Sequence, residues 1–335
     1  MIPLSAADGP QLRDPVTVLM PVYNARETLE VAVRSALDQI GVEVRLLVVD
    51  DGSTDDCMSW LKELRDPRVR LQSIPHAGIA AALNHGYALV DTPYVARLDA
   101  DDYCVPERLV RQIAWLEQHP DLDGVGCAVE FFQNDPQSPV LLLRKPTSPA
   151  LFRWELFFGC PMAHSALLIR TEAWRRMGRL RDGMAEDYEW YCRHADHLRL
   201  ANLTESLVRI RAHAAQTTIT REREQRRAMV EVLTGLVERS LGRTLSADEA
   251  SALLFPELLG ELDSPIAMAR VAIDLIEDAE TWMLRRRLSL QDAEAIRLDA
   301  TIRVRRLVYH ALRVSRSGGA GILPRWLRRR YRKRK

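Results

Sequence analysis

Residues 44–53 read VRLLVVDDGS, and residues 94–102 read YVARLDADD. In each stretch a short run of mainly apolar residues ends in carboxylates. A short apolar run is typical of a strand buried on both faces of a parallel sheet, and a polar cluster at its end is typical of the loop that follows. The two stretches therefore predict buried strands whose carboxyl ends carry acidic side chains.

The first hundred residues repeat this strand–loop–helix pattern. Strands are expected at Val16–Met20, Val44–Val49, Val69–Ser73 and Tyr94–Leu98, and helices near Ala25–Gln39, Asp56–Leu64 and Gly78–Leu89. Strands that alternate with helices build a parallel sheet with crossover helices. The expected fold class is therefore α/β, with a Rossmann-like, mostly parallel sheet and flanking helices.

The pattern changes twice further along the chain. Up to Thr220 it is mixed, with a helix at Pro106–Gln118, strands near Val125–Phe132 and Ala166–Arg170, and a helix from about Glu186. Beyond Thr220 apolar residues recur at helical spacing, which predicts helices at Glu224–Leu241, Ser246–Leu259, Ile266–Leu284 and Leu290–Val314. We expect an α/β domain over residues 1–220, an all-helical appendage over 221–320 and a basic tail over 321–335.

The charges are distributed unevenly along the chain. There are 47 basic and 46 acidic side chains, but from residue 301 onward there are 13 Lys or Arg and no Asp or Glu. The five cysteines form no CxxC pair, which fits reduced thiols in a cytosolic protein. No apolar stretch approaches the roughly 18 residues of a membrane span, and the first residues lack a signal-peptide pattern. A cytoplasmic location is expected.

Four polar clusters follow the expected strands or open the next helix. They are Pro21-Val22-Tyr23-Asn24, Asp50-Asp51-Gly52-Ser53, Ala77 to Gly86, and Asp99-Ala100-Asp101-Asp102. In open parallel sheets the ligand crevice lies outside the carboxyl ends of the strands. Asp-Gly-Ser alone also makes a good turn and helix cap. Three Asp within four residues, in contrast, repel one another unless a cation neutralises them, and their oxygens suit Mg²⁺ or Mn²⁺.

Five motifs, in this order, resemble those of family 2 glycosyltransferases, which have the GT-A fold and mostly invert the anomeric centre of the transferred sugar. They are VLMPVYNARETLEVAVRSALDQ, VVDDGSTDD, HAGIAAALNHGYALVDTPYVARLDADD, CPMAHSALLIR and AEDYEWYCR. The resemblance covers about residues 14–218. It implies a metal-dependent enzyme that moves a sugar from a nucleotide diphosphate to a hydroxyl of a lipid-linked or cell-surface glycan.

The resemblance also implies a donor site. Tyr23 and Asp51 would line the nucleoside pocket, Asp99 would lie toward the ribose, and Asp101 would hold the metal. The other residues expected at the nucleotide sugar are Pro21, Asn24, Asp50, Asn84, His164, Glu186 and Arg211, and His213 is a second expected metal ligand. Asn84 also fits close packing of its helix on the sheet. The sequence does not discriminate among UDP, GDP and dTDP donors, and UDP is the first expectation.

The acceptor hydroxyl must lose its proton as it attacks, so the reaction needs a base. The resemblance assigns this role to Asp187 of the pair Glu186-Asp187. The pair could instead only open a helix, whose amide groups carboxylates stabilise. His164 could be a buried structural histidine, and Arg211 and His213 could be surface residues on one face of an edge strand.

The basic tail, GILPRWLRRRYRKRK, combines many cations with large apolar side chains. On a helix, Leu323, Trp326, Leu327 and Tyr331 would share one face, as in segments that lie on anionic lipid. We therefore expect the tail at the inner face of the plasma membrane, near a lipid-linked acceptor. A solvated, disordered end and a nucleic-acid contact are the alternatives, and the rest of the chain lacks the pattern of a nucleic-acid reader.

Two other functions compete with glycosyl transfer. A nucleotidyltransferase shares the sheet and the metal-binding aspartates, but it needs a Gly-rich, basic loop after the first strand, which Pro21-Val22-Tyr23-Asn24 does not provide. A catalytically inactive nucleotide-binding scaffold is expected to lose a carboxylate at the base or metal position, and none is lost here. Glycosyl transfer with inversion is therefore the main prediction.

Overall fold

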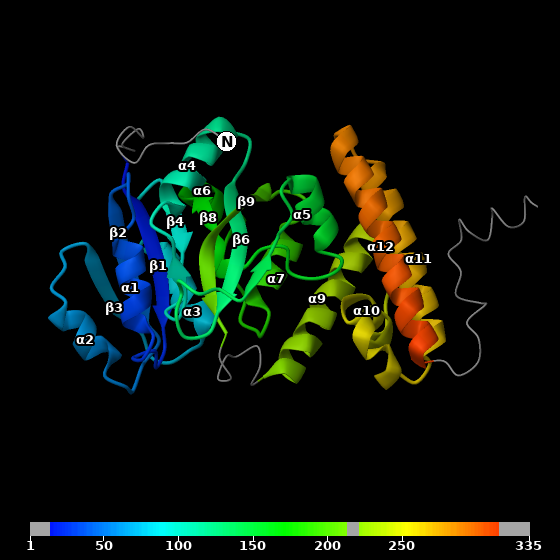
Figure 1. Cartoon of the computed structure of the whole chain (residues 1–335), viewed down its shortest axis with the longest axis horizontal. Coiled ribbons are helices and arrows are strands. Elements are labelled where there is room, and N and C mark those ends of the chain that lie inside the picture. Colours follow the sequence, from blue (N-terminus) through cyan, green and yellow to red (C-terminus); the bar gives the residue numbers. More distant parts are fainter. Residues whose placement is uncertain (1–13, 213–220, 315–335) are drawn as a thin grey trace, which may run out of the picture. The chain divides into compact units, whose positions relative to one another are not determined.

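The computed structural model describes residues 14–212 and 221–314 (Figure 1). His213 and the basic tail lie outside these residues. The chain forms two compact units. Among the described residues, the first contains 14–147, 162–190, 194–212 and 221–222, and the second contains 148–161, 191–193 and 223–314.

The first unit is built on one nine-stranded sheet. Its strands are β1 (Val16–Val22), β2 (Val44–Asp50), β3 (Val69–Ser73), β4 (Tyr94–Arg97), β5 (Tyr103–Cys104), β6 (Gly124–Phe132), β7 (Leu141–Leu143), β8 (Leu168–Arg170) and β9 (Leu200–Arg211). The strand order is β3-β2-β1-β4-β8-β6-β9-β5, and β7 pairs with β6.

The sheet is parallel in one half and mixed in the other. Strands β3, β2, β1 and β4 are parallel, as the sequence predicts. In the other half β6 and β9 are parallel, whereas β8 is antiparallel to β4 and β6, β7 to β6, and β5 to β9. Antiparallel strands need no crossover helix between them, and residues 133–140 join β6 to β7 directly. The predicted α/β class with flanking helices is confirmed.

The helices of the N-terminal part use one apolar face each. They are α1 (Leu29–Leu37), α2 (Cys57–Glu63), α3 (Ile79–Ala88), α4 (Arg108–Gln118), α6 (Thr171–Met177) and α7 (Glu186–Arg193), with a 3₁₀ turn, η1, at His164–Ala166. In α4, Leu109, Ile113 and Leu116 recur at helical spacing and are buried. This burial holds the helices on the sheet and leaves the strand ends to carry the polar loops.

The register of the strands brings the polar clusters to one edge of the sheet. Val22 at the end of β1 pairs with Asp50 at the end of β2, and Asp50 pairs with Ser73 at the end of β3. Strand β4 pairs with β1 in the same direction. The loops that follow these strands therefore converge, as expected for a parallel sheet.

The alternative interpretation places Arg211 on an edge strand. β9 pairs with β6 as far as Arg211, and β5 pairs with β9 on the other side only at Val208 and Arg209. The alternation of its side chains is interrupted because Thr204 and Glu205 have no counterpart where Leu203 pairs with Cys127 and Ser206 with Ala128. Such a bulge disrupts the two-residue period on which the sequence argument relies.

The second unit is helical, which confirms the predicted appendage. It contains α5 (Pro149–Glu155), α9 (Glu222–Leu241), α10 (Ala247–Leu254), the 3₁₀ helix η2 (Pro256–Glu261), α11 (Pro265–Leu284) and α12 (Leu290–Val314). The upstream helix α5 joins this unit because Trp154 Nε1 donates to Asp299 Oδ2 of α12 at 2.7 Å. None of the described helices combines the length and hydropathy that a membrane span requires.

Candidate active site

Three carboxylates meet directly after β4. One oxygen from each of Asp99, Asp101 and Asp102 lies within 4.8 Å of the others. Asp102 is buried, and its burial, together with the charges of Asp99 and Asp101, raises the pKa of Asp102 well above its usual value. Hard oxygen ligands under mutual repulsion are the donor set that Mg²⁺ or Mn²⁺ prefers. The residues therefore fit a divalent cation.

Arg97, the last residue of β4, supplies positive charge under this cluster. It is 2% exposed, and its guanidinium donates to Asp99 Oδ2. Burial alone would lower the pKa of Arg97, but the charges of Asp99, Glu186 and Asp102 outweigh burial and raise it. Arg97 therefore stays charged and partly compensates the carboxylates around it.

Arg211, the last residue of β9, ties the aspartate loop to the sheet. Its backbone N–H donates to Asp102 Oδ1 at 3.1 Å, and its Nε donates to the Asp101 carbonyl at 3.1 Å. Its guanidinium also lies over the Phe132 ring, 4.6 Å from the centroid. The structure thus places Arg211 beside the aspartate cluster.

A second group of side chains forms beside the loop after β2. The Tyr23 ring is half exposed and stacks on the His76 ring with centroids 4.2 Å apart. Asp51 is buried and accepts from the backbone N–H groups of Ala77 and Gly78, at 2.8 and 2.9 Å. His76 Nδ1 lies 2.9 Å from Asp51 Oδ2. Stacked rings beside a carboxylate offer a face and an acceptor to a nucleobase.

His76 was not among the residues predicted from the sequence. It directly precedes the segment Ala77 to Gly86, and an aromatic ring at that position is the only signal that could have identified it. Its contact with Tyr23 joins two loops that are far apart in the sequence, so only the folded chain reveals it.

Other predicted donor residues shape the loop. Asn24 Oδ1 accepts from the Thr54 N–H at 2.8 Å, and the Asn24 N–H donates to Ser53 Oγ at 3.0 Å. Asp50 Oδ1 accepts from the Ser53 N–H at 2.9 Å. Pro21 lies within β1, opposite Val49. These residues hold the Asp51 loop in place.

Asn84 is placed for packing. Its amide nitrogen donates to the Leu180 carbonyl, and its oxygen accepts from the Leu180 N–H, both at 2.9 Å. Nearby, a Cβ on Gly86 would come within 2.2 Å of Leu19 Cδ1. The close approach of α3 to the sheet matches the packing alternative for this helix.

The pair Glu186-Asp187 opens helix α7, next to a buried histidine. His164 Nδ1 lies 3.9 Å from Glu186 Oε1. Burial and the charge of Arg97 lower the pKa of His164 to about 3, so its imidazole is neutral near pH 7. Burial also raises the pKa of Glu186. Asp187 is half-buried and accepts from the Tyr188 N–H at 2.6 Å.

The structure brings this group to the aspartate side of the site. The charges of Asp187 and Asp99 both act on His164, and Arg97 acts on Glu186 and Asp99. His164 was interpreted either as a donor-site residue or as a buried structural histidine. In the structure it is a buried histidine that lies within the candidate site.

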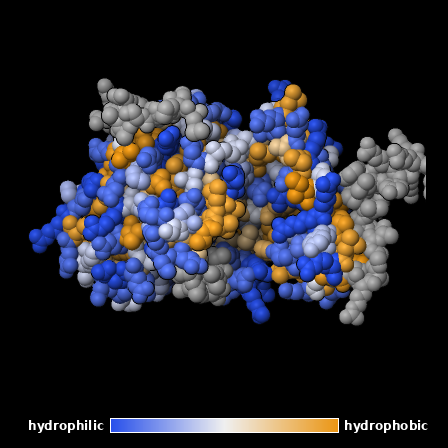
Figure 2. Space-filling model, in the orientation of Figure 1, coloured by the Kyte–Doolittle hydropathy of each residue, from blue (hydrophilic) through white to orange (hydrophobic). Residues whose placement is uncertain are grey.

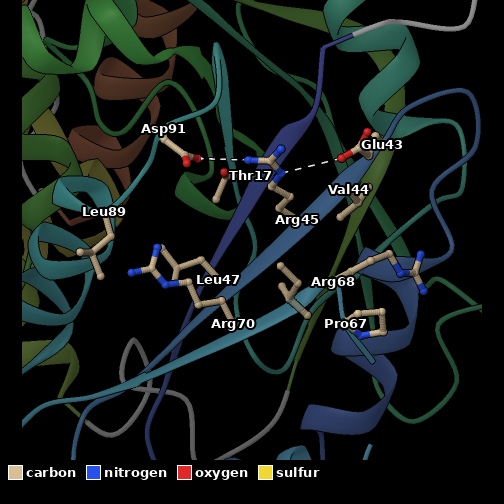
Figure 3. Close-up of a pocket in the computed structure, with 11 residues that line it drawn as sticks. Thr17, Glu43, Val44, Arg45, Leu47, Pro67, Arg68, Arg70, Leu89 and Asp91 are labelled. Carbon is tan, nitrogen blue, oxygen red and sulfur yellow. Dashed lines mark hydrogen bonds and ion pairs between the residues drawn. The ribbon is translucent and has the colours of Figure 1, made fainter. Parts of the chain in front are cut away.

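A cavity at the other end of the strands is separate from this cluster. Its lining includes Thr17, Arg45 and Asp91, and Arg45 lies between Asp91 and Glu43 (Figure 3). Arg45 Nη1 is 3.4 Å from Asp91 Oδ1, and Arg45 Nε is 3.8 Å from Glu43 Oε1. Because Val16 and Val44 begin their strands here, the cavity lies opposite the aspartates.

Comparison with known proteins agrees with this fold and sequence pattern. Residues 17–175 match the profile of Glycosyl transferase family 2. The Bacillus subtilis protein named putative glycosyltransferase EpsE is 29% identical over 205 residues, which cover 58% of this chain and 72% of that protein. The fold resembles that of S. aureus TarS 1-349 in complex with UDP-GlcNAc, with a TM-score of 0.55 and 14% identity over 89% of this chain and 90% of that chain.

A second solved structure has the same fold. It is the mannosyltransferase PcManGT from Pyrobaculum calidifontis in complex with GDP-Man and Mn²⁺. Its TM-score is 0.55, with 18% identity over 93% of this chain and 90% of that chain. Fold and sequence together define a glycosyltransferase of the GT-A type. Residues 17–175 match the family 2 glycosyltransferase pattern that the motifs in this part of the chain predict.

Proposed function

We propose that this glycosyltransferase moves one sugar from a nucleotide diphosphate to a hydroxyl acceptor, with inversion and with a divalent cation. The proposal rests on the position of Arg97. This residue interacts with the carboxylates that follow β4 and also with Glu186, so the two groups lie in one site. Donor and acceptor chemistry need both groups at one end of the sheet.

The donor half of the proposal rests on Tyr23, Asp51 and the aspartates. The Tyr23–His76 pair would stack against the base, and Asp51 would accept a hydrogen bond from it. Asp101, with Asp99 and Asp102 beside it, would hold the cation, and a bound cation stabilises charge on the diphosphate leaving group. The Mn²⁺ of PcManGT supports this assignment. His213 is proposed as a further ligand and lies outside the described residues.

The acceptor half rests on Asp187. A carboxylate near the reacting hydroxyl can take its proton as the bond to the sugar forms. Asp187, half-buried at the start of α7, is the base we propose for this role. Glu186 and His164 would contact the sugar as hydrogen-bonding groups.

The acceptor is proposed to be a lipid-linked or cell-surface glycan. The support is the basic, aromatic tail after residue 320, which we propose lies on the anionic inner face of the plasma membrane. In this proposal residues 1–220 carry the catalysis, residues 221–320 are an appendage, and UDP is the first nucleotide to test because TarS was solved with UDP-GlcNAc.

The proposal is tested by donor turnover. Purified protein is incubated with UDP-, GDP- and dTDP-sugars and Mn²⁺, with and without a membrane extract as acceptor source, and released nucleoside diphosphate is measured. We expect slow release from one donor and faster release with the extract. If calorimetry shows no binding of any of these donors in the presence of Mn²⁺, the enzyme proposal fails.

Gly52 provides a test of the nucleoside pocket. Its φ is +72°, and a Cβ there would lie 2.8 Å from the backbone N of His76. We expect Gly52→Ala to displace His76 from Tyr23 and to weaken nucleoside diphosphate binding about tenfold, as measured by calorimetry. Gly178→Ala is the control, because Gly178 has φ +81° and nothing within 4 Å of a Cβ. If the two variants bind the nucleoside diphosphate with equal affinity, His76 is not part of the nucleoside pocket.

A further inference from the structure

The hairpin formed by β6 and β7 exposes a run of apolar side chains. Residues 140–143, here called the hairpin ribbon, are Val140, Leu141, Leu142 and Leu143, with exposed fractions of 66%, 60%, 41% and 41%. β7 pairs with β6, and no other described strand pairs with it. Because successive side chains of a strand point to opposite faces, both faces of the ribbon are apolar and exposed.

This exposure is unusual for the first unit. Figure 2 shows hydrophobic residues reaching its surface in separate patches among hydrophilic ones. Single exposed apolar side chains are common on soluble proteins, whereas a contiguous set marks an interaction surface. An exposed edge strand with a run of four apolar residues also promotes aggregation unless a partner or another surface covers it.

The hairpin is fastened to the candidate active site. Arg211 Nη1 donates to the Gln133 carbonyl at 3.1 Å, and Arg209 Nη1 donates to the Pro136 carbonyl at 2.7 Å, so the first half of the loop between β6 and β7 is held. At its far end the Val140 N–H donates to the Phe131 carbonyl at 2.7 Å. The same Arg211 holds the backbone of Asp101 through its Nε. The ribbon is therefore fixed relative to the aspartate cluster.

A cation lies directly beside the ribbon. Glu130 pairs with Arg209 at 3.1 Å, whereas Asp135, in the loop before the ribbon, keeps its negative charge while it accepts from the Gln137 N–H at 2.9 Å and from Ser138 Oγ at 3.1 Å. Directly after the ribbon comes Arg144, which is exposed. An apolar segment next to a cation suits a surface with anionic headgroups above hydrocarbon.

We propose that the hairpin ribbon inserts into the boundary between headgroups and acyl chains of an anionic bilayer and so holds the active site at the membrane surface. The link to catalysis rests on the proposed lipid-linked acceptor. A three-residue strand is about 10 Å long, which matches the roughly 5–10 Å depth of interfacial insertion. This contact is distinct from the one proposed for the basic tail.

The exposure on both faces favours a bilayer over a protein partner. A second copy that paired with the free edge of β7 would bond its backbone but leave the side chains on both faces in water. A flat protein surface would cover one face. Only a medium that surrounds the ribbon removes all four side chains from water.

Vesicle binding by the full chain tests this proposal. The native protein, the double variant L141S/L142S and the control Ile40→Ser are compared on phosphatidylcholine vesicles containing about one third phosphatidylglycerol. Ile40 is a matched control because it is 40% exposed in the same unit. We expect the double variant to bind about tenfold or more weakly and the control to bind within about twofold of the native protein. The difference should persist at high salt, where the cationic tail is screened.

Two results would overturn the membrane proposal. One is equal vesicle binding by the double variant and the native protein at high salt. The other is a concentration-dependent dimer, seen by light scattering, that the double variant loses, which would assign the ribbon to a second copy. Donor binding in the presence of Mn²⁺ is measured in parallel by calorimetry. If the native protein binds none of the donors, glycosyl transfer fails separately, and the vesicle comparison still decides the membrane contact.

Discussion

Asp187→Asn is expected to reduce the rate of sugar transfer by roughly 10²–10⁴-fold, the usual contribution of a general base. The amide keeps an oxygen that can accept from the Tyr188 N–H at the start of α7, so the local structure should survive. Donor affinity should stay within about twofold of the native value, because Asp187 acts on the acceptor. The measurement is kcat for transfer to an acceptor, beside the donor dissociation constant from calorimetry.

The control for this variant is Asp182→Asn. Asp182 is an exposed carboxylate in the loop before α7, and its loss should leave both constants unchanged. Native-like transfer by Asp187→Asn, together with loss of transfer in Glu186→Gln, would move the base to Glu186. In that case the raised pKa of Glu186 would be part of the chemistry.

Removal of the divalent cation should abolish turnover of the donor, and Mn²⁺ or Mg²⁺ should restore it. The reason is that Asp99, Asp101 and Asp102 hold their oxygens within 4.8 Å of one another, and a cation is the group that makes this arrangement favourable. The measurement is nucleoside diphosphate release after dialysis against EDTA and again after metal is returned.

Thermal unfolding gives a second reading of the same site. A ligand that binds only the folded protein stabilises it, by about 2.7 kcal/mol at 100 times its dissociation constant. Mn²⁺ should therefore raise the unfolding temperature of the native protein but not of Asp101→Asn. Asp91→Asn, at the opposite end of the strands, should respond like the native protein. Full turnover of the donor in EDTA would contradict the cation site and would show that Arg97 is sufficient to offset the negative charge of the three carboxylates.

The fold was predictable where apolar runs are short, buried and bounded by polar loops. Strands β1 to β4 and helices α1 to α4 lie where the sequence places them. Strands β1, β2 and β4 are buried along almost their whole length and need no alternating pattern. Strands β5 and β7, most of β9, and helices α5 and α6 were not predicted. β7 is three exposed residues long, and α5 is a short helix that lies far from its packing partners in the sequence.

The candidate site was predictable in its chemistry but not in its contacts. The three aspartates predict a cation site because like charges close together need a positive partner. The fold does bring the three carboxylates together. Asn24 and Asp50 were expected to contact the donor. In the structure their side-chain oxygens accept hydrogen bonds from backbone N–H groups of the loop after β2, because such an oxygen can bond to a nearby N–H as readily as to a ligand. Whether the oxygen bonds to the backbone or to a ligand depends on which N–H groups the fold brings close to it.

The sequence by itself determined the α/β class, the helical appendage and the family 2 glycosyltransferase motifs, because these depend on residues close together along the chain. Only the tertiary structure decided that His76 stacks on Tyr23, that Arg97 lies buried beneath the carboxylates, and that Arg211 ties the exposed hairpin to them. The His76 and Arg211 contacts join segments that are adjacent only after the sheet has formed, and the packing of the sheet buries Arg97, which strengthens its interaction with the neighbouring carboxylates.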